Sequence, residues 1–224
     1  MDFRIKDFDE YKEQYDKSIQ QPEEFWGGIA EKYTWKKKWS NVLKWNFEEP
    51  RIEWFIGGQL NITENCLDRH LEERGNKLAL IWEPNDPKER FVRFTYKELH
   101  EEVCRMANIL KSKGVVQGDR VALYMPMLPE LTIAVLACAR IGAVHSVVFA
   151  GFSAQALADR VNDATAKMII CSDYNNRGQK CILVKKVVDE AMAMGCPSIE
   201  TILCHKNTGG SVDWNAKTDK WWHE

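Results

Sequence analysis

From residue 77 onward, short apolar segments alternate with stretches of ten or more residues that have helical periodicity. The apolar segments lie within KLALIWE, DRVALYMP, VHSVVF, KMIIC and ETILCHK, and several are apolar at consecutive positions. Strands that are apolar on both faces require a sheet that is covered on both faces. Because helices separate the strands, neighbouring strands can run parallel. The sequence therefore predicts an α/β fold, with a mostly parallel sheet and helices on both faces.

The helix with the clearest start and end is predicted in FTYKELHEEVCRMANILKSKG, residues 94–114. Thr95 and Glu98 have the spacing of a capping box, in which each side chain satisfies a backbone N–H at the helix start. Gly114 is placed to end the helix in the left-handed conformation. One apolar stripe has helical spacing and predicts the buried face: Leu99, Val103, Met106 and Leu110.

Residues 1–76 lack this alternation. Five of the nine tryptophans lie between Trp26 and Trp54, and the basic run WKKKW falls among them. Interleaved basic and aromatic residues can bind single-stranded nucleic acid. However, one short basic run in a chain of net charge −2 favours an arm that packs its indoles on a domain surface. We therefore expect a helical and irregular arm at 1–76 and an incomplete α/β subdomain at 77–224.

Composition argues against several classes of protein. No apolar run approaches the roughly 20 residues that span a bilayer, and the acidic N-terminus is unlike a signal peptide. The seven cysteines are scattered without a CxxC pair, which indicates reduced thiols in a cytoplasmic protein and no metal site. His145 lies inside an apolar segment without an identifiable nucleophile or carboxylate nearby, so it is interpreted as a core histidine. We expect neither nucleic acid nor a membrane as a partner.

Two loops follow predicted strands at the edge where open parallel sheets bind ligands. In VFAGFS, Phe149 offers an aromatic face and Gly151 lets the backbone approach a ligand. In SDYNNRGQK, Arg177 offers a planar fork for phosphate oxygens, and Lys180 offers a mobile charge beyond Gly178. Taken alone, each loop is more typical of an ordinary turn. The residues themselves leave open both a phosphate-bearing ligand and two turns without a ligand.

A long stretch of the sequence carries a family resemblance. Residues 94–173, from FTYKELHEE to KMIICSD, resemble the N-terminal part of AMP-forming acetyl-CoA synthetases, of the adenylate-forming acyl-CoA synthetase and luciferase-like superfamily. NITENCLDRHLEERGNKLALIWE and the final VDWNAKTDKWWHE are similar too. Within this stretch, ACARIGAVHSVVF is specific to the branch that acts on acetate and propionate.

The resemblance implies a two-step reaction. Acetate and ATP give acetyl-adenylate and pyrophosphate, and the thiol of CoA then displaces AMP to give acetyl-CoA. It also implies that the loop Arg177, Gly178, Gln179 and Lys180 contacts CoA near a nucleotide phosphate. The loop Phe149, Ala150 and Gly151 would line the adenine end of the same ligand. Ala150 stands where the family often has glycine.

Several parts of the family pattern do not occur in this sequence. No Ser/Thr/Gly-rich loop with a lysine is present to bind ATP phosphates. The resemblance places that loop, the acyl pocket, the Mg²⁺-binding acid and the C-terminal domain beyond Glu224. It therefore implies a fragment that carries part of the CoA site, has no catalytic residue and is inactive without the rest of its parent chain.

Three other interpretations compete with a fragment of an acetyl-CoA synthetase. One is a fragment of a propionyl-CoA synthetase, and another is a self-contained, non-catalytic nucleotide- or CoA-binding module. A dinucleotide-binding dehydrogenase is disfavoured because no G-x-G-x-x-G follows the first predicted strand. The sequence does not decide between acetate and propionate, and it does not give the oligomeric state.

Overall fold

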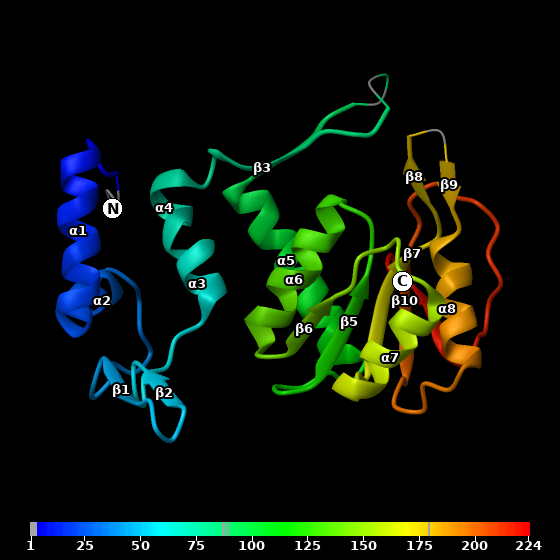
Figure 1. Ribbon diagram of the computed structural model, residues 1–224. Helices are drawn as coiled ribbons and strands as arrows, with labels where there is room; N and C mark the ends of the chain where they lie inside the picture. The colour runs from blue at the N-terminus through cyan, green and yellow to red at the C-terminus, as the bar shows by residue number, and fades with distance from the viewer. Residues whose placement is uncertain (1–3, 87, 89, 179) are drawn as a thin grey trace. The chain divides into compact units, whose positions relative to one another are not determined.

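The computed structural model describes residues 4–86, 88, 90–178 and 180–224. The chain forms two compact units, Met1–Cys66 and Leu67–Glu224, and most of their helices and strands are labelled in Figure 1. The boundary expected after residue 76 lies inside the second unit, and the division into an arm at 1–76 and an α/β subdomain at 77–224 stays a prediction.

The first unit combines helices with one hairpin. Its helices are α1 (Phe8–Gln20), α2 (Pro22–Ala30) and α3 (Ile62–Cys66), and its antiparallel strands are β1 (Leu43–Asn46) and β2 (Arg51–Trp54). The hairpin was not predicted, because both strands have four residues and are largely exposed. The rings of Trp35, Trp39 and Phe55 lie 4.8–5.6 Å apart, so part of the aromatic content packs within this unit.

The second unit is built on a five-stranded sheet. Its order is β11 (Asp219–Trp221), β10 (Thr201–His205), β7 (Met168–Ser172), β5 (Arg120–Tyr124) and β6 (Val144–Val147). Every neighbouring pair is parallel, which confirms the predicted sheet. The short strand β11 was not predicted, because three residues give no pattern of their own.

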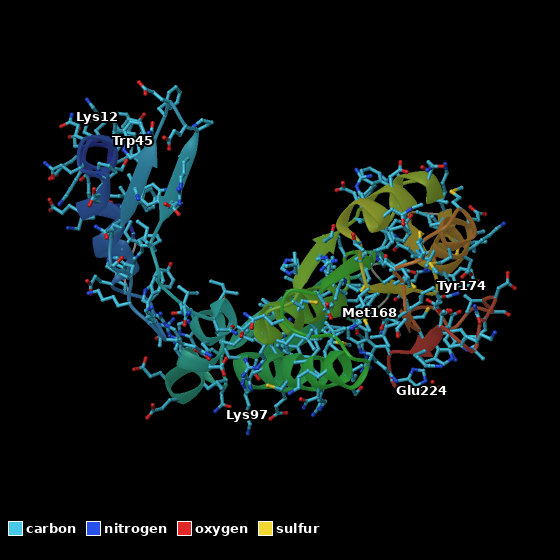
Figure 2. All side chains as sticks on the ribbon, turned by 90° about the horizontal axis from the view of Figure 1, so that it is seen from below. Lys12, Trp45, Lys97, Met168, Tyr174 and Glu224 are labelled. Atoms are coloured by element: carbon cyan, nitrogen blue, oxygen red, sulfur yellow. The ribbon has the colours of Figure 1, made fainter. Side chains whose placement is uncertain are left out.

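Helices cover both faces of this sheet, as predicted. On one face α5 (Tyr96–Ser112) and α6 (Pro129–Ile141) pack against Val121 and Leu123 of β5. On the other face α7 (Ala154–Ala164) and α8 (Val184–Ala193) pack against Ala122 and Tyr124. Alternating side chains of one strand thus belong to two separate cores. Figure 2 shows Met168 of β7 inside this unit and the exposed Lys97 of α5 pointing away from it.

The predicted start, end and buried face of α5 are all confirmed. Thr95 Oγ1 accepts the Glu98 N–H at 3.2 Å, and Glu98 Oε2 accepts the Thr95 N–H at 2.8 Å. Gly114 follows the helix with φ +81°. The predicted stripe is buried in the core: Leu99, Val103, Met106 and Leu110.

The remaining elements of the second unit lie outside the five-stranded sheet. They are the 3₁₀ turn Asp68–His70, α4 (Leu71–Arg74) and two antiparallel hairpins. The first hairpin pairs β3 (Leu78–Trp82) with β4 (Val92–Thr95), so KLALIWE is a strand but does not join the main sheet. The second pairs β8 (Asn175–Arg177) with β9 (Lys180–Ile182), where the sequence suggested a polar turn. None of the helices in the described part of the chain is long and apolar enough to cross a membrane.

Candidate functional site

A cavity of about 1080 Å³ opens at the carboxyl ends of the parallel strands. The segments that follow β5, β6, β7 and β10 all contribute to it, and so does the connection between β3 and β4 (Figure 1). Its lining includes Met125–Leu128, Val147–Gly151, Asn175–Gly178, Asn207 and Thr208. Ligands of open α/β sheets bind at this edge. The cavity is therefore the candidate site.

The two loops singled out from the sequence meet in this cavity. Phe149, Ala150 and Gly151 line it together with Arg177 and Gly178. The guanidinium carbon of Arg177 lies 5.8 Å from the centre of the Phe149 ring, which is within the range of a cation–π contact. The Phe149 residue is 56% exposed, so its ring is open to a ligand.

The predicted site also includes Lys180 and Gln179. Lys180 begins β9 and is exposed, but it does not line the cavity. Gln179 lies outside the described residues. The assignment of these seven residues to a CoA site stays a prediction.

Contacts with β5 hold the loop after β6 in place. The buried Tyr124 hydroxyl donates to the Phe152 carbonyl at 2.7 Å, and the Val148 N–H donates to the Leu123 carbonyl at 2.9 Å. Burial raises the pKa of Tyr124, which keeps this donor protonated. A Cβ on Gly151 would lie 2.5 Å from Phe149 Cε1. Glycine at this position therefore lets the Phe149 ring lie across the loop.

The β3–β4 connection forms a further wall that the sequence did not predict. Trp82 Nε1 donates to the Met127 carbonyl at 2.7 Å. Asn85 pairs reciprocally with the backbone of Gly178, with both bonds at 3.4 Å. Asn85 and Gly178 are 93 residues apart, so no local pattern links them. Glu83 and Asp86 also line the cavity, so its negative side chains lie on this wall and the positive Arg177 lies on the β8 hairpin.

A buried carboxylate at the end of β7 was missed as well. Asp173 is 0% exposed and accepts hydrogen bonds from the backbone N–H groups of Tyr174, Asn207, Thr208 and Gly209. The sequence signal was an aspartate directly after an apolar strand, but three of its four backbone partners lie more than thirty residues further along.

The described residues that line the cavity include no histidine, cysteine or serine. His145 lies in β6 and does not line the cavity. No group of three or more His, Cys, Asp or Glu residues in the described ranges could hold a metal ion. At His205, at the end of β10, burial lowers the pKa, and its nearest carboxylate oxygen, of Glu130, is 3.7 Å away. The side chains that line the cavity include groups that can donate hydrogen bonds, such as Arg177, Asn176 and Asn207.

Known proteins resemble this chain in sequence and in fold. Acetyl-coenzyme A synthetases are 48% identical over 218 residues in Halorhodospira halophila and 50% identical over 221 residues in Penicillium chrysogenum. These alignments cover 97% and 98% of this chain but 34% and 33% of the relatives. The chain thus spans about a third of the length of these curated relatives. The solved acetoacetyl-CoA synthetase from Streptomyces lividans superposes with a TM-score of 0.83 at 25% identity, covering 93% of this chain and 31% of that one.

Two family models divide the sequence between them. The model described as acetyl-coenzyme A synthetase N-terminus matches residues 11–66. The model described as AMP-binding enzyme matches residues 67–223, which is more than half of the chain. The resemblance identified in the sequence is confirmed, and the chain belongs to the AMP-binding enzyme family.

Proposed function

We propose that this chain is the N-terminal part of an AMP-forming acetyl-CoA synthetase and that its cavity binds the nucleotide end of CoA. The relatives named acetyl-CoA synthetase and the two family models support the parent activity. The observation that carries the CoA assignment is the meeting of the Phe149 loop and the Arg177 hairpin in one cavity. An aromatic face beside a guanidinium suits a ligand that joins a base to a phosphate.

The parent protein, meaning the full-length protein that contains this chain, would make acetyl-CoA in two steps. An acetate oxygen attacks the α-phosphorus of ATP, giving acetyl-adenylate and releasing pyrophosphate. The thiol of CoA then attacks the acetyl carbon, loses its proton, and releases AMP. Groups for ATP, Mg²⁺ and acetate would lie in the rest of the parent chain. The parent would act in the cytoplasm on these small molecules.

Each predicted residue has a role that its chemistry supports. The Arg177 fork would donate two hydrogen bonds to phosphate oxygens, and Lys180 would add a mobile charge. Gly178 follows Arg177 and has φ +59°, a conformation that lets the chain turn there. Gln179 would contact the same ligand. Phe149 would stack on adenine, with the backbone of Ala150 and Gly151 beside it. The carboxylates of Glu83 and Asp86 would disfavour a phosphate on their own wall, the β3–β4 connection.

The test is Arg177→Ala in the parent protein. Charge-assisted hydrogen bonds contribute on the order of 1.5–3 kcal/mol, so KM for CoA should rise by roughly tenfold to a hundredfold. Lys180→Ala should act in the same direction but less strongly. Dephospho-CoA should be less affected than CoA by either change. Acetate-dependent pyrophosphate exchange does not use CoA and should change little.

Arg160→Ala is the matched control. Arg160 also lies over a phenylalanine ring, 4.8 Å from the centre of Phe152, but it does not line the cavity. Its removal should leave the CoA dependence unchanged. Loss of pyrophosphate exchange in Arg177→Ala, with unchanged KM for CoA, would show that the assignment is wrong. Comparing acetate with propionate in the same assay decides the acyl preference.

A further inference from the structure

The carboxylate of Asp173 joins two walls of the cavity. Its Oδ1 accepts the N–H of Tyr174 at 2.6 Å and of Asn207 at 2.8 Å. Its Oδ2 accepts the N–H of Gly209 at 2.7 Å, and the N–H of Thr208 lies 3.2 Å from both oxygens. Tyr174 begins the connection from β7 to the Arg177 hairpin, and the other three donors belong to the loop after β10.

These donors account for the burial of a charged group. A carboxylate that is 0% exposed is costly to desolvate unless hydrogen bonds compensate its charge. Four backbone N–H groups converge on it and replace the hydrogen bonds that water would make. Three of them come from consecutive residues, 207–209. The charge therefore fixes the conformation of that loop.

Further contacts tie the same two loops together. Asn207 Nδ2 donates to the Tyr174 carbonyl at 3.0 Å, and the Tyr174 hydroxyl donates to the Ser211 carbonyl. The Tyr174 ring lies against Gly210, where a Cβ would be 2.3 Å from Cε2. Figure 2 marks Tyr174 in this part of the unit.

We infer that Asp173 is a positioning residue for the nucleotide site, because it holds the loop that leads to Arg177 against the loop that carries Asn207 and Thr208. The inference rests on the proposed function. Asp173 does not line the cavity, whereas residues of both loops that it joins do. It therefore acts on the ligand through the placement of the two walls.

Asp173→Asn is the direct test. The side-chain amide keeps the size but replaces one acceptor with a donor that faces backbone N–H groups. Amide hydrogen exchange of residues 207–209, followed on this chain, should become about tenfold faster. In the parent protein KM for CoA should rise roughly tenfold, which corresponds to about 1.4 kcal/mol, while acetate-dependent pyrophosphate exchange stays near the wild-type rate.

Asp119→Asn is the matched control. Asp119 Oδ2 accepts the Val116 N–H at 2.9 Å, but Asp119 precedes β5 at the opposite end of the sheet. This change should affect neither amide exchange at 207–209 nor KM for CoA.

A second variant avoids the buried charge in case Asp173→Asn does not fold. Gly210→Ala drives a methyl group against the Tyr174 ring and should also raise KM for CoA without slowing pyrophosphate exchange. Gly28→Ala, where a Cβ meets nothing within 4 Å, is its control. The inference is overturned if amide hydrogen exchange at 207–209 is unchanged in Asp173→Asn. It is also overturned if that exchange becomes faster while KM for CoA stays the same. If only Gly210→Ala folds, an unchanged KM for CoA in that variant overturns it.

The failure of the proposed function gives a different result. A parent protein that forms no thioester from CoA would refute the proposed function, and with it the role of Asp173 toward CoA. Amide exchange at 207–209 would still show whether Asp173 holds the two loops.

Discussion

At the scale of single residues, one ion pair joins the start of the second unit to α6. Asp68 accepts two hydrogen bonds from the Arg140 guanidinium, at 2.7 and 2.8 Å. His100 of α5 lies 3.3 Å from the same carboxylate. The hydrogen bonds from Arg140 lower the pKa of Asp68, although partial burial opposes them. Folding therefore favours the ionised form of Asp68, so the stability that this contact contributes depends on pH.

We predict that Asp68→Asn lowers the free energy of unfolding by about 1–2 kcal/mol at pH 7, after allowance for partial exposure. A carboxyl whose pKa is lower in the folded state contributes stability above its unfolded value of about 3.9. That contribution is lost as the pH falls through the folded pKa. Urea unfolding should therefore show a gap from wild type at pH 7 that shrinks below about pH 4. An equal gap at pH 7 and pH 3 would contradict this prediction, and Asp163→Asn, at an exposed position of α7, is the control.

At the scale of elements, a buried lysine of α8 forms an ion pair with β11. Lys185 of α8 is 0% exposed, and its Nζ lies 2.8 Å from Asp219 of β11 and 2.5 Å from Asp189. Burial lowers the pKa of Lys185, but the hydrogen bonds to both carboxylates outweigh that effect and raise it. Burial raises the pKa of Asp189, and its Oδ2 atom has no hydrogen-bond partner. Lys185 is therefore the buried cation for both carboxylates.

We predict that Lys185→Met destabilises the chain by about 3–5 kcal/mol, because it leaves a carboxylate buried without its cation. The double variant Lys185→Met/Asp219→Asn removes the two fully buried charges and should be less destabilised than the single variant. Lys186→Met changes an exposed neighbour on the same helix and should have little effect. Chemical denaturation of the three variants provides the measurement. Equal losses in the single and double variants would show that the buried charge is not the cause.

Among the elements, those with a local sequence pattern could be predicted, and those that depend on tertiary pairing could not. The parallel strands and α5 were predictable because their apolar periodicity and capping residues lie within each segment. The hairpin β8–β9 and the strand β11 have three residues in each strand, so their pairing depends on tertiary contacts. Phe149 and Arg177 could be predicted to lie near the carboxyl edge of the sheet, because each follows a predicted strand. The roles of Asn85 and Asp173 could not be predicted, because each bonds residues far along the chain.

At the scale of the whole molecule, the described residues form a cavity at the edge of the sheet, and the sequence contains no Ser/Thr/Gly-rich loop with a lysine. Arg177, the cation that lines the cavity, is assigned to CoA rather than to the transferring phosphate of ATP. Stabilisation of the charge that develops during phosphoryl transfer usually requires several groups aimed at it.

We predict that this chain alone does not catalyse acetate-dependent exchange of pyrophosphate with ATP. Radiolabelled pyrophosphate gives the measurement, with the parent protein as the positive control. Turnover above background would show that adenylation needs no more than these residues. Binding of CoA by this chain, measured separately, would show that it is folded during the assay.

The two hairpins beside the cavity also have an evolutionary consequence. Asn85 and Arg177 lie on segments outside the five-stranded sheet, and both residues are exposed. Substitutions at such positions cost little stability, whereas Val121, Leu123 and Ile170 are held by the packing of the core. Lineages that inherit this fold can therefore explore new ligands by changing a few hairpin residues. Their cores would diverge more slowly than the walls of their cavities.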